Sequence, residues 1–131
     1  MITKKINPCS MKMPTKAYSN GILVDLGGAQ MLFVTGQLAQ DNNGNVVAPF
    51  NYEAQTEFIF EQLGRILVES NMSFDNVVKA QIFVKDIRNS SKISAIRDKY
   101  FKNSKPASTM VEVSGFVKEE CCVEIEIIAV K

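Results

Sequence analysis

Two glutamates near the C-terminus are the residues best placed to do chemistry. Glu124 and Glu126 are two positions apart in an alternating run, so in a strand they share one face at a separation of roughly 7 Å. If a partner subunit covers that face, at least one carboxyl is desolvated and its pKa is raised. Such a group could act as a general acid or base, or position a water. A solvated sheet edge or an intersubunit ion pair is the alternative, and the spacing alone favours it.

A threonine, a glycine and a tyrosine form a second possible site. Thr35 and Gly36 stand at the end of a run that is typical of a strand. A glycine there allows close backbone approach, and its amide could bind a carboxylate or carbonyl oxygen. Tyr18 could present its phenol to a cleft. The spacing alone favours a plain strand end for the first two and an amphipathic rim residue for Tyr18.

The absence of histidine restricts the chemistry further. Without any histidine among its 131 residues, the chain lacks the commonest general base, the Ser-His and Cys-His nucleophile pairs and the commonest zinc ligand. Cys9, Cys121 and Cys122 have no C-x-x-C spacing, so we expect no protein-held metal. Their odd number argues against a disulfide framework and favours reduced thiols in the cytoplasm. The adjacent pair could be redox-active, but ordinary burial of small side chains is the more common explanation.

Charge and hydropathy argue against two classes of partner. The 15 basic and 14 acidic residues leave a net charge of +1, and the lysines are scattered, whereas nucleic-acid binders carry a basic face. Lys4 and Lys5 form a small cluster that we interpret as a solvated end. The chain has no run of about 18 apolar residues, and its first residues lack the apolar core of a signal peptide. We therefore expect a cytoplasmic protein that binds neither nucleic acid nor membranes.

The length suits one domain, residues 1–131, and the apolar spacing predicts five strands and two helices. The expected strands span residues 17–26, 30–37, 76–85, 109–113 and 121–130. The first helix is expected from an Asn51 N-cap to about residue 70, and the second from a Ser90 or Ser91 cap to about residue 101. Gly27 and Gly28 turn the first two strands into a hairpin, and residues 41–45 form a loop.

The same spacing predicts which side chains are buried. The helix stripes comprise Ile59, Phe60, Leu63, Ile66 and Leu67 in the first helix, and Ile93, Ile96 and Tyr100 in the second. The buried strand faces comprise Val78, Ala80, Ile82 and Val84, and in the last strand Cys121, Val123, Ile125, Ile127 and Ala129.

The order β-β-α-β-α-β-β indicates an α+β fold in which two helices cover one face of one mixed sheet. The other face would carry apolar side chains mixed with polar ones: Phe33 or Leu32, Met110, Ile128 and Val130. An uncovered sheet face of this kind usually contacts a partner. Self-association is the simplest way to cover it.

Six segments, taken in order, resemble the RidA/YjgF family. They are residues 33–38 (FVTGQL), 53–56 (EAQT), 77–86 (VVKAQIFVKD), 105–107 (KPA), 111–113 (VEV) and 123–130 (VEIEIIAV). The resemblance implies a chorismate-mutase-like fold and a homotrimer with a small-molecule cleft between each pair of subunits. It also implies hydrolysis of reactive 2-imino and enamino acids to 2-keto acids and ammonia, without a cofactor.

The resemblance assigns roles to individual residues. Glu124 matches the glutamate that holds the attacking water, Tyr18 matches the cleft tyrosine, and Gly36 supplies a backbone amide. Thr35 stands where the family usually has serine. Further substrate contacts are expected from the strand that holds Ser108 and Met110.

Two departures from the family pattern bear on function. The family's deaminases read Pro-Ala-Arg-Ser, and that arginine clamps the substrate carboxylate with two hydrogen bonds. Here Ser108 stands at its position, and Lys16-Ala17 replace the Gly-Pro before the tyrosine. A serine cannot neutralise a carboxylate, so Lys105 or Lys118 is the expected substitute cation, as a point charge rather than a fork.

The remaining arginines, Arg65, Arg88 and Arg97, are expected on helices or a loop away from the cleft. Two functions follow from the resemblance and its departures. One is a hydrolase of imines or enamines with an altered substrate, and the other is a non-catalytic trimer that binds or senses a ligand. The charge balance gives no support to a ribonuclease activity.

Overall fold

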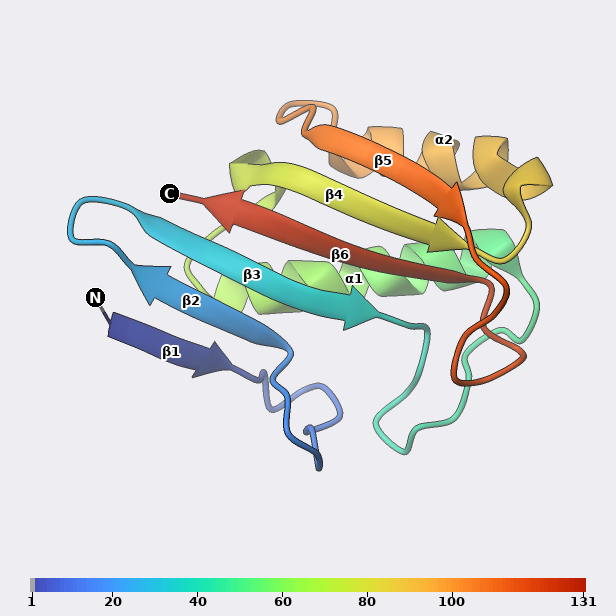
Figure 1. Cartoon of the computed structure of the whole chain (residues 1–131), viewed down its shortest axis with the longest axis horizontal. Coiled ribbons are helices and arrows are strands. Elements are labelled where there is room, and N and C mark those ends of the chain that lie inside the picture. The colour runs from blue at the N-terminus through green and yellow to red at the C-terminus, as the bar shows by residue number, and fades with distance from the viewer. Residues whose placement is uncertain (1) are drawn as a thin grey trace.

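The computed structural model describes residues 2–131 and contains one six-stranded mixed sheet with both helices on the same face (Figure 1). The elements, in chain order, are β1 (Ile2–Ile6), β2 (Gly21–Asp25), β3 (Gln30–Gln37), α1 (Tyr52–Glu69), β4 (Val77–Val84), α2 (Ser90–Tyr100), β5 (Ala107–Glu112) and β6 (Val123–Val130). Short 3₁₀ turns, Phe74–Asn76 and Ile87–Asn89, precede β4 and α2. The predicted α+β architecture is confirmed.

The strand order is β1-β2-β3-β6-β4-β5. The strands β4 and β5 run parallel and are joined through α2, while the other neighbours are antiparallel. The last strand, β6, therefore lies in the middle of the sheet, and β5 forms one edge.

The helix α1 supplies most of the core beneath the sheet. Its predicted stripe of five apolar residues is completely buried, which confirms the helical period. Asn51 caps the helix as predicted, because its Oδ1 accepts a hydrogen bond of 3.0 Å from the backbone N–H of Ala54. The helix ends at Glu69, close to the predicted position.

The helix α2 joins the core through its aromatic end. Ile93 and Ile96 are buried as predicted, and Tyr100 stacks on Phe60 with ring centroids 4.6 Å apart. The predicted serine cap is wrong, since the helix already begins at Ser90. The preceding 3₁₀ turn makes Asn89 the N-cap, and this residue forms no side-chain capping bond.

The strand β1 is an element that the sequence pattern did not predict. It pairs antiparallel with β2, from Ile2 opposite Asp25 to Ile6 opposite Gly21. Within it only Ile6 is buried, so the segment 2–6 shows no alternation that would mark it as a strand. The predicted first strand is correspondingly shorter, because β2 begins only at Gly21.

A β-bulge shifts the predicted burial at the start of β4. The register against β6 slips between Val77 and Lys79, and an extra residue in a bulge rotates the side chains around it. Val77 is therefore 2% exposed and Val78 47% exposed, so the predicted burial of Val78 is wrong. From Ala80 onward the predicted alternation holds.

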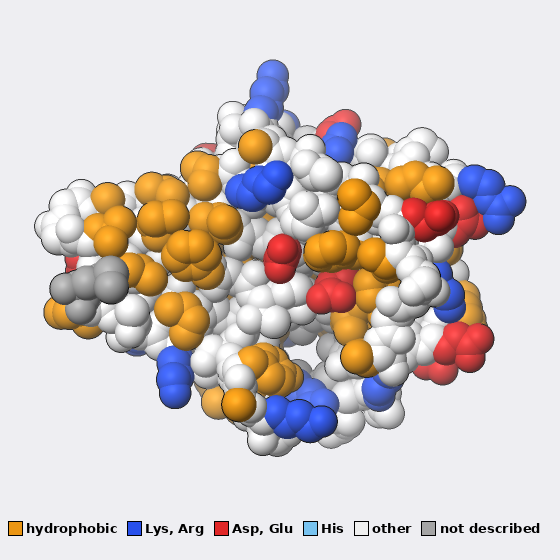
Figure 2. Space-filling model, in the orientation of Figure 1, with side chains coloured by type: hydrophobic (Ala, Val, Ile, Leu, Met, Phe, Trp, Pro, Cys, Tyr) orange, Lys and Arg blue, Asp and Glu red, His pale blue; other side chains and the backbone are white. Residues whose placement is uncertain are grey.

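The sheet face opposite the helices carries an apolar area with acidic side chains beside it (Figure 2). Cross-strand partners point to the same face, and the register aligns Ile22 with Phe33 and Phe33 with Ile128. Of the predicted open-face residues, Phe33 and Ile128 are confirmed. Leu32 and Met110 belong instead to the helix-covered core, Leu32 as a fully buried residue and Met110 as a partly buried one.

Candidate functional site

The carboxyl group of Glu124 lies against Gly36 on the open sheet face. The register between β3 and β6 shifts between Val34 and Gln37, and Gly36 lies within this irregular stretch, next to the Glu124 side chain of β6. A Cβ atom on Gly36 would lie 2.8 Å from Cδ of Glu124 and 3.0 Å from its Cγ. Glycine is therefore the residue that leaves this carboxyl room where it stands.

Burial perturbs the acidity of this group. Desolvation raises the pKa of Glu124, and the nearby charge of Glu126 raises it further. Glu126 itself is exposed on the same face. The sequence-based expectation that at least one of the two carboxyls has a raised pKa is confirmed for Glu124. A carboxylate with a raised pKa is a stronger base than an ordinary one, so it accepts a proton from water more readily.

A buried glutamine anchors the loop that leads to this carboxyl. The Nε2 of Gln55 donates to the carbonyl oxygens of Ala48 and Glu120, at 3.0 and 2.9 Å, and its Oε1 accepts from the N–H of Cys122 at 2.8 Å. The side chain is completely buried. Gln55 thus fixes the backbone two residues before Glu124 and orients the start of β6.

A small pocket of about 180 Å³ is lined by the three predicted substrate-binding residues that lie in the N-terminal part of the chain: Tyr18, Thr35 and Gly36. The Thr35 hydroxyl donates to the carbonyl oxygen of Ser19 at 2.6 Å, which ties the loop that carries Tyr18 to the end of β3. Gly36 belongs both to this pocket and to the contact with Glu124. The pocket and the carboxyl therefore adjoin through one backbone position.

Two further residues of this pocket were missed by sequence reasoning. Asn20 is 7% exposed, and its Nδ2 has no hydrogen-bond partner among residues 2–131, although a buried amide usually has one. Lys12 lines the pocket and brings its ammonium group close to Gly44. No pattern in the sequence marks Asn20 or Lys12 as a pocket residue.

Ser108 and Met110 lie on the other side of the sheet from Glu124. In the parallel register Ser108 is opposite Ala80 and Met110 opposite Ile82, and both partners are buried under the helices. In addition, β4 separates β5 from β6, the strand that carries Glu124, a distance of roughly 9–10 Å for two strand spacings. One chain alone does not bring Ser108 or Met110 to Glu124.

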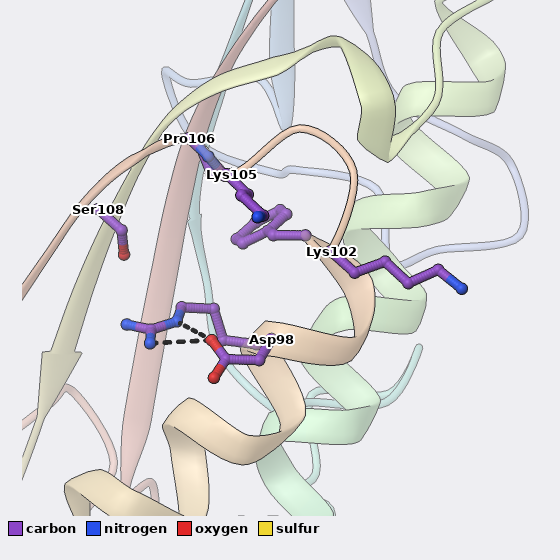
Figure 3. A pocket seen from close by; sticks show the side chains of 7 residues that line it. Asp98, Lys102, Lys105, Pro106 and Ser108 are labelled. Atoms are coloured by element: carbon purple, nitrogen blue, oxygen red, sulfur yellow. Dashed lines mark hydrogen bonds and ion pairs between the residues drawn. The ribbon is translucent and has the colours of Figure 1, made fainter.

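Ser108 lines a second pocket of about 360 Å³, between the end of α2 and the start of β5 (Figure 3). Lys105 also lines it, as does Arg97. Arg97 lies on a helix as expected, in α2, and its side chain lines the same pocket as Ser108. The 3.6-residue period showed that Arg97 follows the buried Ile96, but it could not show how far the side chain reaches toward the neighbouring edge strand.

Lys118, the second predicted substitute cation, lines neither of these two pockets. Its ammonium group donates to the carbonyl oxygen of Gly44. The adjacent residue, Val117, lines the pocket of Tyr18. Lys118 therefore connects two loops at the rim of that pocket.

Two observations concern the described part of the chain as a whole. Residues 2–131 contain no cluster of three or more His, Cys, Asp or Glu side chains arranged to hold a metal ion. None of the helices in this part of the chain has the length and apolar character needed to span a membrane.

Comparisons of the sequence with known proteins point to one family. A family model described as Endoribonuclease L-PSP matches residues 10–131. The chain is 33% identical over 118 residues to the RutC family protein SSO3206 of Saccharolobus solfataricus, with 90% of each chain covered. It is 29% identical over 131 residues to the 2-iminobutanoate/2-iminopropanoate deaminase of Rattus norvegicus, which covers 100% of this chain and 92% of the deaminase.

The fold leads to the same family. The crystal structure of the YjgF gene product from E. coli aligns with a TM-score of 0.82 at 28% sequence identity, over 98% of both chains. Because the family model matches nearly the whole length, the chain belongs to the Endoribonuclease L-PSP family, which is the RidA/YjgF family that its sequence resembles.

Proposed function

We propose that this protein hydrolyses reactive imines or enamines of small 2-keto acids, with Glu124 as the group that activates water. The observation that carries the proposal is the desolvated carboxyl of Glu124, held against Gly36 next to the pocket of Tyr18 and Thr35. The deaminase relative from Rattus norvegicus, whose name specifies 2-imino acids, supports this substrate class.

The reaction needs only water as a co-reactant. In its ionised form Glu124 accepts a proton from water as the water oxygen attacks the imine carbon, and the C=N double bond becomes a single bond. Glu124 then gives the proton to the nitrogen, which yields a carbinolamine. The hydroxyl proton of this intermediate next passes through Glu124 to the nitrogen, the C–N bond breaks with release of ammonia, and the remaining C–O bond becomes C=O. A raised pKa suits this cycle, because it makes the ionised carboxyl a stronger base toward the attacking water. No cofactor is required for any of these steps.

The complete cleft in this proposal forms between copies of the chain in a homotrimer. The pocket of Tyr18 and the pocket of Ser108 lie on different sides of one subunit, so they can contribute to one site only across an interface. The apolar open face, with Phe33 and Ile128, is suited to burial in such an assembly. We place this trimer in the cytoplasm, in agreement with the free thiols of the cysteines.

The position of Ser108 supports a second candidate function. A guanidinium at this position would bind a carboxylate, and a serine does not replace its charge. A trimer that binds a ligand without converting it, as a sensor or regulator, would also use the pockets described above. The two candidates differ in whether a bound ligand is turned over.

The test compares turnover in three forms of the protein. A 2-imino acid is generated in situ by an amino-acid oxidase, and semicarbazide traps the imine that escapes hydrolysis. We expect the wild-type protein to lower trapping, Glu124→Ala to be inactive, and the neighbouring control Glu126→Ala to remain active. Size-exclusion chromatography with light scattering checks that each variant is still a trimer.

Each outcome decides between the candidates. Activity that survives in Glu124→Ala would remove this residue from the mechanism. A wild-type protein that binds a keto acid but leaves every imine unchanged would favour the non-catalytic trimer.

A further inference from the structure

The pocket of Ser108 has a basic lining. Three cationic residues, Arg97, Lys102 and Lys105, and one acidic residue, Asp98, lie around it. Figure 3 shows Ser108, Lys105 and Asp98 grouped around the space between the end of α2 and the start of β5. A concave surface with excess positive charge attracts an anionic ligand.

Arg97 is the cation best suited to bind such a ligand. Its side chain is 26% exposed, so it is largely desolvated, and its acidic partner is the adjacent Asp98. Both contacts of this pair, from Nε at 3.0 Å and from Nη2 at 2.9 Å, go to the same oxygen of Asp98. Nη1 therefore has no partner in the part of the chain that the structure describes.

The pair with Asp98 is weak enough to yield to a ligand. The Asp98 side chain is 68% exposed, and exposed ion pairs contribute little free energy because water competes for both groups. A planar carboxylate could therefore take up the unused N–H groups of the guanidinium with two parallel hydrogen bonds.

The small side chain at position 108 leaves space in front of this guanidinium. Ser108 ends in a single hydroxyl, which lines the same pocket and can add one hydrogen bond. On the opposite rim, the N–H of Lys105 bonds to the carbonyl oxygen of Phe101 at 2.9 Å, so the turn that follows α2 is fixed to the helix. Arg97 on α2 and Ser108 on β5 therefore flank a turn that a backbone hydrogen bond fixes to the helix end.

We infer that Arg97, assisted by Ser108, binds the carboxylate of the substrate. This inference rests on the proposed function, because it assumes that the reacting molecule is a 2-imino acid. It goes beyond that function by assigning the carboxylate to a residue of α2 rather than to β5. A neutral imine, such as that of an amide or an aldehyde, would then be a poor ligand.

The test uses a stable ligand, so that it does not depend on turnover. Titration calorimetry measures the binding of 2-oxobutanoate and of its neutral amide to wild type, Arg97→Met and Arg97→Lys. Arg88→Met is the matched control, since Arg88 also pairs with a nearby aspartate, Asp86, but lies outside this pocket. Circular dichroism and light scattering confirm that each variant is folded and assembled.

The expected result is a loss of binding specific to the acid. Losing a charge-assisted hydrogen bond costs about 1.5–3 kcal/mol, which corresponds to roughly 10- to 100-fold in Kd. Arg97→Met should lose this factor for 2-oxobutanoate and little for the amide, and Arg97→Lys should fall between. Arg88→Met should bind like wild type.

Other outcomes separate this inference from the proposed function. If wild type does not prefer the acid to the amide, or if Arg97→Met keeps that preference, the assignment of Arg97 is overturned, whatever the turnover assay gives. If Arg97→Met loses the preference while no form hydrolyses imines, the carboxylate site is supported and the hydrolase function fails.

Discussion

The substitution Gly36→Ala isolates the contact that holds the reactive carboxyl. It adds one methyl group whose carbon would lie 2.8 Å from Cδ and 3.0 Å from Cγ of Glu124. These separations are shorter than ordinary carbon–carbon contacts of about 3.5–4.0 Å. The backbones of β3 and β6 are paired on both sides of this position, so the glutamate side chain is the part that moves.

The cost in stability should be small. Forcing the glutamate away from its rotamer costs about 0.5–1.5 kcal/mol. Replacing a glycine by alanine where the backbone allows it stabilises by about 0.4–1 kcal/mol, because the unfolded chain loses freedom. Gly36 has no positive φ angle, so this second effect applies. The two effects offset each other to within about 1 kcal/mol, which corresponds to a change in Tm of only a few degrees.

The cost in activity should be much larger. The methyl group needs the carboxyl to shift by on the order of 1 Å, and a misplacement of this size reduces catalysis by roughly 100-fold. We therefore expect Gly36→Ala to fold with nearly the wild-type Tm and to hydrolyse imines about 100-fold more slowly. Gly115→Ala is the control, since a Cβ at Gly115 would meet no atom within 4 Å.

The measurement pairs thermal unfolding, followed by circular dichroism, with the imine-trapping assay. Wild-type turnover by Gly36→Ala would refute the reasoning, because it would mean that the position of the Glu124 carboxyl does not limit the reaction. A Tm lower by many degrees would refute the expected small cost in stability, because it would show that the Glu124 side chain cannot move aside.

Three further predictions concern stability. Folding raises the pKa of Glu124 above the ordinary 4.5, so its charged form destabilises the folded state, and the penalty grows as the pH rises from about 4.5 through the raised folded value. Glu124→Gln should therefore raise Tm at pH 7, and this gain should shrink toward pH 4. Gln55→Leu removes three hydrogen bonds between a buried side chain and the backbone, one of them fully buried. It should lower the free energy of unfolding by about 3 kcal/mol in urea titrations, and an unchanged urea midpoint would contradict this. Tyr100→Phe removes the 2.8 Å hydrogen bond to Glu57 but keeps the ring, so we expect a loss of about 1–2 kcal/mol above pH 5, and an equal stability of the two proteins there would argue against it.

Most of the fold could be predicted because apolar residues recur at regular spacing in the elements that pack against the centre of the core. In α1 every residue of the predicted stripe is buried, since this helix packs under the centre of the sheet. In β6 the alternation from Val123 to Ala129 holds without interruption. Long elements with one buried face leave little ambiguity in the sequence.

The errors occur where burial does not control the pattern. The strand β1 lies at the sheet edge, and backbone pairing with β2 rather than apolar side chains defines it. Val78 is misplaced because a bulge adds a residue without any signal in the sequence. These features depend on partners that are distant in the chain, which local patterns do not record.

The candidate site could be predicted in part for a similar reason. Tyr18, Thr35 and Gly36 could be grouped by the family resemblance, and the structure brings them together. Arg97 could not be assigned, because its relation to Ser108 arises from the packing of a helix end against an edge strand. The family resemblance shows that Ser108 replaces an arginine on β5. It gives no information on Arg97, which reaches the same pocket from α2.

The separation of the two pockets has a consequence for mixtures of inactive proteins. In the proposed trimer, each cleft takes Glu124 from one copy and Arg97 from its neighbour, because the two pockets lie on different sides of the subunit. A subunit that lacks Glu124 still offers an intact Arg97, and a subunit that lacks Arg97 still offers an intact Glu124. When two such genes are expressed in one cell, a mixed trimer contains one cleft with both residues. Two mutations that each abolish activity should then complement one another.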